Sequence, residues 1–245
     1  MDTRDDKTAR LSNINISKSN SLYLHYHFYH EKLFSAIKRY INGDLIDIGC
    51  GNKPCLETIN PLVTKYIGCD IIQSSNQCVD VLCPANDIPL AEATFDTVFS
   101  SQTIEHVEDH QGLVNEAYRL LKPNGYFVLT GPMYWPLHEE PHDFFRFTKH
   151  GFRHILEKAG FEIIEINSNG GKWAVAGQAL LHAVYPAMYN VKGIKGKLIK
   201  SMAFLLGGIK TINRIFTYLD TKNYDPVNTM NYVIVARKNN ENLSS

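Results

Sequence analysis

The chain has 245 residues with 25 basic and 25 acidic side chains, so its formal net charge is zero. This length is enough for one sizeable core with an appendage, and the even charge balance gives no reason to expect a nucleic-acid partner. The five cysteines are an odd number without a C-x-x-C pair, which favours free, buried thiols in a reducing, cytoplasmic compartment. No run of 18 uninterrupted apolar residues occurs, so no membrane-spanning helix is predicted.

Helical and extended patterns alternate along most of the chain. Residues 1–20 are polar and are predicted to form a flexible arm, and a helical pattern over residues 21–41 then stops at Asn42-Gly43. Further helices are expected before Lys122-Pro123 and after Thr148, which can act as an N-cap. Strands are predicted at residues 45–48, 66–69, 78–82, 95–99, 126–130, 161–166 and 232–236. This alternation implies an α/β fold: a Rossmann-like, doubly wound and mostly parallel sheet covered by helices on both faces.

The alternation stops after residue 166, where about 60 residues precede the last strand. Helices are predicted there near residues 173–189 and 197–219, and Gly207-Gly208 is expected to kink the second one. Residues 166–219 contain no acidic side chain but seven basic ones, namely Lys172, Lys192, Lys195, Lys197, Lys200, Lys210 and Arg214. This basic insertion is either a substrate cap that touches an anionic membrane or a lipid-linked phosphate, or an ordinary helical appendage with solvated lysines.

Residues 45–54 (LIDIGCGNKP) carry the clearest functional signal. A buried strand ends in Asp47, a glycine-punctuated turn follows, and a second predicted strand ends in Asp70. This is the layout of a nucleotide-type crevice, in which the later acid can bind two ribose hydroxyls. Pro54 stands where a dinucleotide fingerprint would have its third glycine, and it has no N–H to offer a pyrophosphate. A ligand with ribose and adenine but no phosphate fits better, which favours S-adenosylmethionine over a nicotinamide cofactor.

Six motifs in order resemble those of class I S-adenosylmethionine-dependent methyltransferases of the type 11 family. They are Asp47-Ile-Gly-Cys-Gly51, Asp70, residues 88–90 before residues 95–98, residues 104–107, residues 116–125, and residues 159–161. The resemblance covers roughly residues 45–161 and the last strand, and it implies a seven-stranded sheet whose last strand is antiparallel. A narrower resemblance over residues 135–148 (WPLHEEPHDFFRFT) is to a bacterial subgroup associated with polysaccharide and sugar modification.

The resemblance also implies roles for individual residues. Asp47 and the turn around Gly49 would hold the methionine end of the cofactor, and Asp70 would bind the ribose. Leu82 and Cys83 would border the adenine, and Gln102 would lie below the sulfonium. The complete set expected to bind the cofactor is Asp47, Gly49, Cys50, Gly51, Asp70, Ile71, Leu82, Cys83 and Gln102. Two departures from the family pattern are Lys53, in place of a third glycine, and Pro84-Ala85, in place of an Asp-Ala pair.

An alcohol acceptor needs a base as it attacks a methyl group, and histidine suits that work near neutral pH. His142 with Asp143 is the preferred base-plus-orienter pair, and Arg146 is expected to hold an anionic substrate group. His106 completes the predicted catalytic set. The structural alternative is a loop in which Arg146 merely pairs with Asp143. A metal site could also be drawn from His138, His142, Asp143 and the two glutamates, Glu139 and Glu140. No metal is expected there, because Pro141 spoils a helical i, i+4 pair and no second cluster is evident.

The sequence therefore predicts a flexible arm (residues 1–20), a cofactor-binding core (21–169), a helical substrate cap (170–230) and a last strand (231–238). The expected enzyme is an S-adenosylmethionine-dependent methyltransferase that O-methylates a sugar or another small or lipid-linked acceptor. The alternative is a non-catalytic cofactor-binding or scaffold protein. The expected location is cytoplasmic, with weak peripheral contact of the basic insertion with the inner membrane face.

Overall fold

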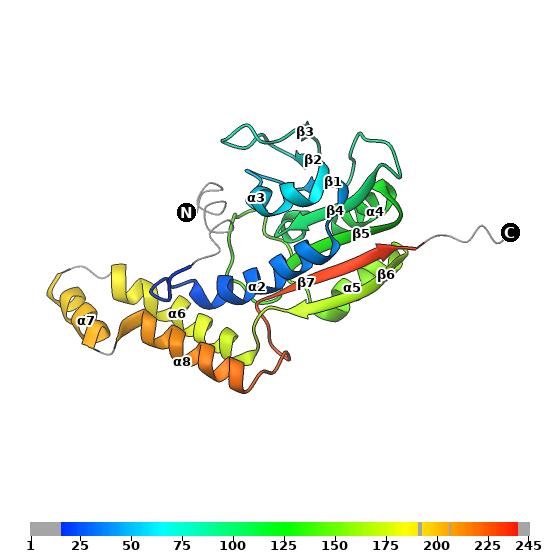
Figure 1. Ribbon diagram of the computed structural model, residues 1–245. Coiled ribbons are helices and arrows are strands. Elements are labelled where there is room, and N and C mark those ends of the chain that lie inside the picture. The colour runs from blue at the N-terminus through cyan, green and yellow to red at the C-terminus, as the bar shows by residue number, and fades with distance from the viewer. Residues whose placement is uncertain (1–15, 191–192, 206, 240–245) are drawn as a thin grey trace. The chain divides into compact units, whose positions relative to one another are not determined.

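The computed structural model describes residues 16–190, 193–205 and 207–239, and these fall into two compact units (Figure 1). Of the described residues, the first unit comprises 32–167 and 231–239, and the second comprises 16–31, 168–190, 193–205 and 207–230. The segment predicted as a flexible arm lies mostly outside the described residues. Within its described part, the carbonyl oxygens of Lys18 and Asn20 accept hydrogen bonds from the Asn213 side chain, at 2.7 and 2.8 Å.

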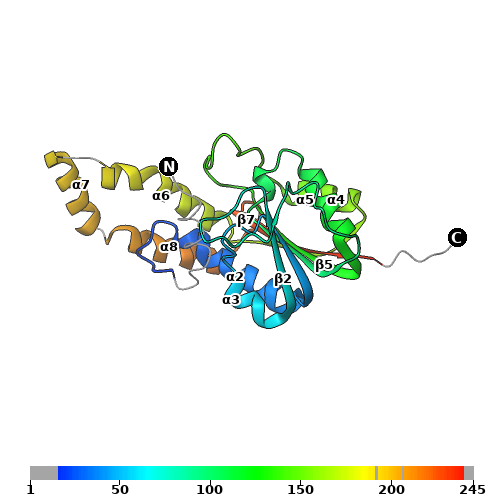
Figure 2. The ribbon, with the colours of Figure 1, turned by 90° about the horizontal axis from the view of Figure 1, so that it is seen from above.

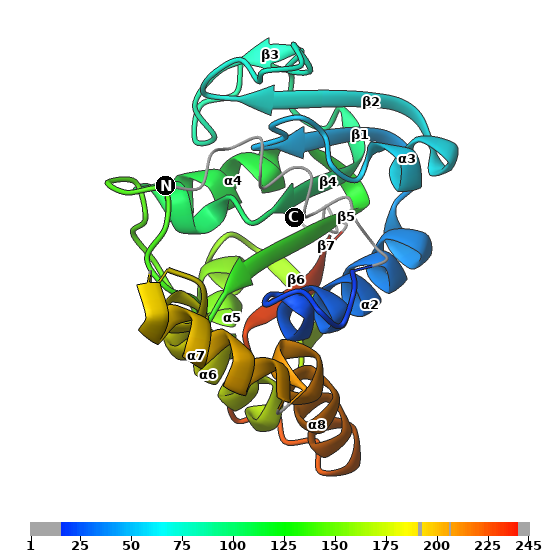
Figure 3. The ribbon, with the colours of Figure 1, turned by 90° about the vertical axis from the view of Figure 1, so that its left-hand side faces the viewer.

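The first unit is built on a seven-stranded sheet with the strand order β3-β2-β1-β4-β5-β7-β6, which Figure 3 shows from the side. Strands β1 to β5 pair in parallel, and β7 pairs antiparallel with β5. The strands are β1 (Gly43–Ile48), β2 (Val63–Asp70), β3 (Val81–Leu82), β4 (Phe95–Ser101), β5 (Leu121–Pro132), β6 (Phe161–Ser168) and β7 (Asn231–Lys238). The predicted Rossmann-like fold with an antiparallel last strand is thus confirmed.

The third strand is shorter than predicted, because residues 78–80 form part of a turn. The Cys78 amide donates to Ser74 Oγ at 3.0 Å, and Gln77 has a positive φ of 59°. The Asp80 carboxylate accepts a hydrogen bond from the Gly68 amide at 2.7 Å, in the place where a strand neighbour would pair. The Asp80 amide still donates to the Gly68 carbonyl at 2.9 Å, but only Val81 and Leu82 pair with β2 as a strand.

Helices cover both faces of this sheet (Figure 2). Helices α4 (His110–Leu120) and α5 (Lys149–Lys158) lie on one face, whereas α3 (Leu56–Ile59) and the C-terminal part of α2 (Tyr23–Tyr40) lie on the other. Thr148 caps α5 as predicted, since its hydroxyl accepts from the Gly151 amide at 3.1 Å, and Asp109 caps α4 in the same way. The core of the unit is formed by apolar side chains of β1, β4, β5 and β7 packed with those of α4 and α5.

The second unit contains α6 (Lys172–Asn190), α7 (Gly193–Leu205) and α8 (Gly208–Lys222). The single helix predicted near residues 197–219 is wrong in this respect: α7 ends and α8 begins around Gly207, whose φ of +75° interrupts a right-handed helix. Asp220 is buried and its carboxylate accepts hydrogen bonds from the Gly171 and Ala174 amides at the start of α6. Among the described residues, no helix is long and apolar enough to cross a membrane.

Candidate functional site

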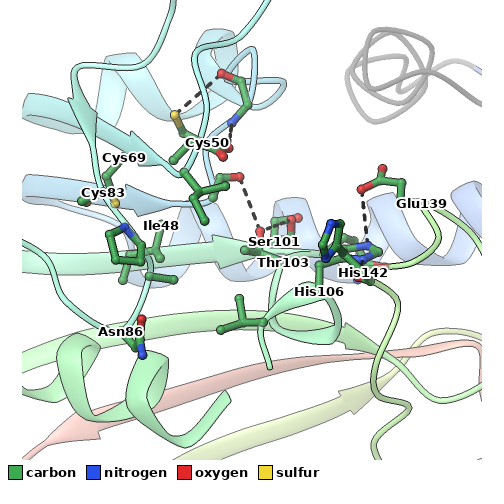
Figure 4. A pocket seen from close by; sticks show the side chains of 18 of the residues that line it. Ile48, Cys50, Cys69, Cys83, Asn86, Ser101, Thr103, His106, Glu139 and His142 are labelled. Atoms are coloured by element: carbon green, nitrogen blue, oxygen red, sulfur yellow. Dashed lines mark hydrogen bonds and ion pairs between the residues drawn. The ribbon is translucent and has the colours of Figure 1, made fainter. Parts of the chain in front are cut away.

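A cavity of about 700 Å³ opens at the carboxyl ends of β1, β2 and β4 in the first unit (Figure 4). Strand β1 pairs with β2 on one side and with β4 on the other, so chain connections leave the sheet in opposite directions at this point. Crevices at such a switch point are the usual ligand sites of doubly wound sheets. The volume suits a ligand the size of a nucleoside with a substituent.

The turn after β1 exposes its backbone to this cavity. Gly49 and Gly51 have φ values of +76° and +49°, and the amides of Gly49 and Cys50 both donate to the Cys69 carbonyl, at 2.8 and 3.0 Å. A Cβ atom on Gly49 would clash with the Thr103 side chain, whereas one on Gly51 would meet no protein atom within 4 Å. Gly49 therefore allows close packing of the turn, and Gly51 leaves space for a ligand. Both residues and Cys50 line the cavity, and their contact with a cofactor stays a prediction.

Asp70 lies at the end of β2 and lines the same cavity. Its side chain is largely buried, and its carboxylate accepts hydrogen bonds from the amides of Gly51 at 3.1 Å and Ile72 at 3.4 Å. These two bonds fix the carboxylate beside the glycine turn, where it can accept hydrogen bonds from vicinal hydroxyls. The neighbouring Ile71 also lines the cavity and exposes an apolar side chain.

Asp47 lies behind the turn, not among the residues that line the cavity. It is only 3% exposed, and its carboxylate accepts a hydrogen bond from the Tyr66 hydroxyl at 2.5 Å. Burial raises the pKa of Asp47 from 3.8 to about 7, against the opposing effects of the Tyr66 hydrogen bond and the charge of Lys53. The carboxyl group is thus close to its midpoint of ionisation at neutral pH, which makes it responsive to a nearby cationic ligand.

Lys53 adopts a positive φ of 52° at the position where many relatives of the resembled family have glycine. Its side chain passes over Gly68, where an added Cβ would lie 2.5 Å from Lys53 Cε. It ends in an ion pair with Asp80 at 2.6 Å, and its Nζ lies 5.0 Å from the centre of the Tyr66 ring. The left-handed turn is therefore held by side-chain contacts to β2 and the segment after it.

The predicted adenine border is only partly formed by the predicted residues. Cys83 is buried and lines the cavity, but Leu82 is 59% exposed and is not among the lining residues. Successive strand residues point to opposite faces, and it is the preceding residue, Val81, that packs on the core. The sequence analysis missed Asn86, which lines the cavity and donates to the Asp109 carboxylate at 3.0 Å.

Gln102 follows β4 and lines the cavity floor together with Ser101 and Thr103. It has a φ of +55°, which is uncommon for a residue with a side chain and typical of functional turns. Its amide and its side-chain Nε2 both donate to Thr130 Oγ1 at 3.0 Å. The turn after β4 is thereby fixed to β5.

A group of histidine and glutamate side chains borders the cavity beyond Gln102. His106, at the end of η2 (Ile104–His106), and Glu139 and His142, in the segment after β5, all line it. His106 Nδ1 lies 2.7 Å from the His142 carbonyl oxygen, and since a carbonyl can only accept, the ring donates there. His106 Nε2 faces Glu139 Oε2 at 3.7 Å (Figure 4) and Glu105 Oε1 at 3.9 Å.

Asp143 does not lie where an orienter of the His142 ring would, and Arg146 does not reach the cavity where it was expected to hold a substrate anion. The Asp143 carboxylate accepts from Arg146 at 2.7 and 2.8 Å and from the His138 amide at 2.9 Å, and no bond joins it to the His142 ring among the described contacts. Arg146 also donates to the carbonyl oxygens of Trp135, Pro136 and Phe145. Neither residue lines the cavity, so together they organise the loop between β5 and α5.

Burial by itself would raise the pKa of Asp143. The hydrogen bonds from Arg146 and the His138 amide, and the nearby positive charge, more than offset this effect and lower the pKa below its ordinary value. Asp143 is therefore an anion that is fully engaged by its neighbours. This is the structural alternative that the sequence left open for this pair.

Comparisons with known proteins agree with this geometry. A family profile described as "Methyltransferase domain" matches residues 46–129. A curated protein of Mycolicibacterium smegmatis, named "Probable S-adenosylmethionine-dependent methyltransferase", is 28% identical over 149 residues, which are 55% of this chain and 58% of that protein. The chain thus aligns with less than two thirds of this relative's length.

Solved structures show the same fold. The phosphoethanolamine N-methyltransferase 2 of Haemonchus contortus, solved in complex with S-adenosyl-L-methionine, has a TM-score of 0.55 and 17% identity, with coverage of 97% of this chain and 57% of that one. The [4+2]-cyclase SpnF has a TM-score of 0.54 and 17% identity, with coverage of 85% and 80%. At these identities the likeness concerns the fold alone.

The fold and the crevice are similar to those of the class I S-adenosylmethionine-dependent methyltransferases. Within this chain, residues 46–129 are the part that matches the methyltransferase-domain profile. The cofactor of the class is S-adenosylmethionine, and the cavity fits it: the open space at Gly51 admits a ligand, Asp70 offers acceptors for ribose hydroxyls, and Cys83 and Ile71 supply apolar surface. Asp47 does not line the cavity, so its contact with the methionine end of the cofactor stays a prediction.

Proposed function

We propose that this chain is an active methyltransferase that transfers a methyl group to a hydroxyl of a sugar or of another small or lipid-linked acceptor. The observation that carries the proposal is that one cavity joins the Gly49–Gly51 turn and Asp70 to the His106 side chain. When bound, S-adenosylmethionine supplies an electrophilic methyl group on a sulfonium. The chain's own contribution is to position both reactants and to manage the acceptor's proton.

The group around His106 supports an acceptor that must lose a proton. His106 Nε2 faces two carboxylates within 4 Å, and its Nδ1 is fixed by the His142 carbonyl. An imidazole held beside carboxylates in this way promotes the loss of a hydroxyl proton. His142 has no carboxylate orienter among the described contacts and suits that role less well. We expect His106→Gln to lower turnover by at least tenfold, with S-adenosylmethionine affinity unchanged. His150→Gln, an exposed histidine of α5, is the matched control.

The far part of the cavity supports a polyhydroxylated acceptor. It is lined by Glu139 and His142, together with the ring of the partly exposed Phe144. Carboxylates and imidazoles offer acceptors for several hydroxyl groups, and an aromatic ring can pack on the apolar face of a sugar. An acidic lining also disfavours a free anionic acceptor. The resemblance of residues 135–148 to a sugar-modification subgroup points the same way.

Calorimetry with S-adenosylmethionine and S-adenosylhomocysteine tests the cofactor part of the proposal. Asp70→Asn should weaken binding of both by at least tenfold, because the amide offers one acceptor oxygen where the carboxylate offers two. Glu57→Gln alters an exposed carboxylate of α3 outside the cavity and should bind like the wild type. Absence of binding to the wild-type protein would refute the proposal.

The acceptor is found by incubating the protein with methyl-labelled cofactor and fractionated cell extract. Label is expected in a sugar-containing fraction and should resist mild base, as an ether does and an ester does not. Label in protein or nucleic acid would overturn the acceptor class. Cofactor binding without label transfer to any fraction would favour the alternative, a non-catalytic cofactor-binding protein.

We also propose weak contact of helix α7 with an anionic membrane on the cytoplasmic side. Ile194 and Leu198 are 87% and 61% exposed and lie one helical turn apart, and Lys195, Lys197 and Lys200 are exposed beside them. Each surface lysine contributes about 1 kcal/mol of attraction to anionic lipid. The protein should float with anionic vesicles at low salt and should not float at high salt. The double variant Ile194→Ser, Leu198→Ser should not float at either salt concentration. No flotation of the wild type at low salt refutes this contact.

A further inference from the structure

We propose that Glu105, His106 and His138, with Glu139 beside them, form a binding site for one divalent first-row transition-metal ion, such as Zn²⁺ or Mn²⁺, at the acceptor end of the cavity. The inference deepens the proposed function, on which its catalytic meaning rests. One ligand atom each from Glu105, His106 and His138 lies within 4.8 Å of the others. A carboxylate oxygen of Glu139 lies 3.7 Å from His106 Nε2.

The spacing of these atoms suits a common centre. The separations of 3.7 and 3.9 Å from His106 Nε2 to Glu139 and Glu105 are too long for hydrogen bonds between these atoms. Metal–nitrogen and metal–oxygen bonds are about 2.0–2.2 Å, which places neighbouring ligand atoms of a tetrahedral ion about 3.4 Å apart. Small side-chain rotations would bring the two oxygens into that range.

The outer contacts of the two histidines also match those of metal ligands. His106 donates its Nδ1–H to the His142 carbonyl oxygen, which leaves the Nε2 lone pair directed at the carboxylates. His138 Nδ1 lies 3.2 Å from both the Pro136 carbonyl oxygen and Asp143 Oδ2, and 3.4 Å from Arg146 Nη2. Histidine ligands commonly donate their second nitrogen to a carbonyl or carboxylate in this way.

In such a metal site Asp143 and Arg146 would act as positioning residues, although neither lines the cavity. Arg146 holds the Asp143 carboxylate through two hydrogen bonds, and that carboxylate lies against His138. The chain from Arg146 through Asp143 to His138 would fix the ring orientation of a ligand. Loss of such an outer partner typically costs 10- to 100-fold in metal affinity.

Charge favours a cation at this point. Glu105 is fully buried, and its carboxylate converges with that of Glu139 on the same imidazole. Two carboxylates brought together in a poorly hydrated place repel each other, and a divalent ion between them relieves that repulsion. Two imidazoles with carboxylates suit Zn²⁺, Mn²⁺ or Fe²⁺, whereas Mg²⁺ and Ca²⁺ prefer oxygen ligands alone.

The location explains what such an ion would do. His106 and Glu139 line the cavity. Glu105, His106 and His138 would fill three positions of a tetrahedral ion, so the fourth can face an acceptor hydroxyl. Coordination lowers the pKa of a bound hydroxyl, whose proton then passes to water more readily. The site would therefore select acceptors with a hydroxyl, or two vicinal hydroxyls, that can reach the ion.

The test uses the full-length protein after treatment with a chelator and dialysis. Titration with Co²⁺ should give visible absorption bands of a nitrogen- and oxygen-coordinated ion at one per chain, and Zn²⁺ should displace it. His138→Gln and Glu139→Gln should each weaken Co²⁺ binding by at least tenfold, and Asp143→Asn by 10- to 100-fold. His150→Gln is the matched control, and thermal melting verifies that each variant is folded.

Several outcomes would overturn the inference: no saturable Co²⁺ or Zn²⁺ binding to the wild type, binding that these variants leave unchanged, or a preference for Mg²⁺. Calorimetry with S-adenosylmethionine on the chelated protein separates this inference from the proposed function. Cofactor binding without metal binding refutes the metal site alone. Metal binding without cofactor binding supports the site but refutes the proposed methyl transfer.

Discussion

The buried carboxyl group of Asp47 should make the stability of the protein depend on pH in an unusual direction. Burial raises the pKa of Asp47 from 3.8 to about 7 in the folded state. An unfolded aspartate has a pKa of about 3.9, so between about pH 4 and 7 the folded state binds more protons than the unfolded state. Stability therefore falls as the pH rises through this window, the reverse of a salt-bridged aspartate.

The magnitude follows from the size of the shift. Each pKa unit corresponds to about 1.4 kcal/mol, so a shift of about three units costs about 4 kcal/mol once the group is ionised in both states. Between pH 5 and pH 8, the contribution of Asp47 to the free energy of unfolding should fall by roughly 2–3 kcal/mol. Asp47→Asn removes the titration but keeps an oxygen that can accept from the Tyr66 hydroxyl.

Urea unfolding at pH 5 and pH 8 measures this contribution. Wild-type protein should lose roughly 2–3 kcal/mol more than Asp47→Asn between the two pH values, and Glu57→Gln should behave like the wild type. Equal pH dependence in the wild type and Asp47→Asn would show that Asp47 is already ionised in the folded protein. The assignment of a protonated, buried Asp47 near neutrality would then be wrong.

Four further outcomes are expected. S-Adenosylmethionine should bind up to about tenfold more tightly at pH 8 than at pH 6, because the ammonium group of the ligand favours ionised Asp47; calorimetry at both values, with Asp47→Asn as control, measures this. Gly49→Ala should lose cofactor binding and about 1–3 kcal/mol of stability, since its positive φ and contact with Thr103 exclude a side chain. Phe152→Ala should cost about 3–5 kcal/mol in urea unfolding, because the ring is fully buried. Asp220→Ala should destabilise the second unit by about 1–3 kcal/mol, because two buried amides lose their acceptor. Faster amide hydrogen exchange in α6 would measure this loss.

The sheet could be predicted because its strands are short apolar runs separated by strong turn signals. Residues 45–48 and, apart from the half-buried Asp96, residues 95–99 are buried in the structure as these runs indicate. Their order along the chain agrees with the parallel topology. The length of β3 could not be predicted, because it depends on the Asp80 carboxylate occupying the Gly68 amide. The break between α7 and α8 needed the actual φ of Gly207, which the sequence only suggested.

The candidate site likewise has a part that could be predicted from the sequence and a part that could not. The turn around Gly49 and the acid at Asp70 are local features of two strand ends, so the sequence places them together. The group around His106 is assembled from two distant segments, and its partners Glu105 and Glu139 were not assigned. A signal for Glu139 existed, since it lies between His138 and His142, but only the fold of the loop directs it toward His106. Asp143 was paired with the wrong histidine because the choice depended on where Arg146 points.

The lysine in the glycine-rich turn has a consequence for anyone who would transplant or redesign this crevice. The backbone of Lys53 is left-handed, which a residue with a side chain adopts at a cost of about 1–2 kcal/mol. Here that cost is offset by Asp80 and Tyr66, and the path between them is open because residue 68 has no side chain. Positions 53, 66, 68 and 80 thus form one structural unit. A graft that moves the turn without its three supports should misplace the loop, and a variant library should vary these four positions jointly.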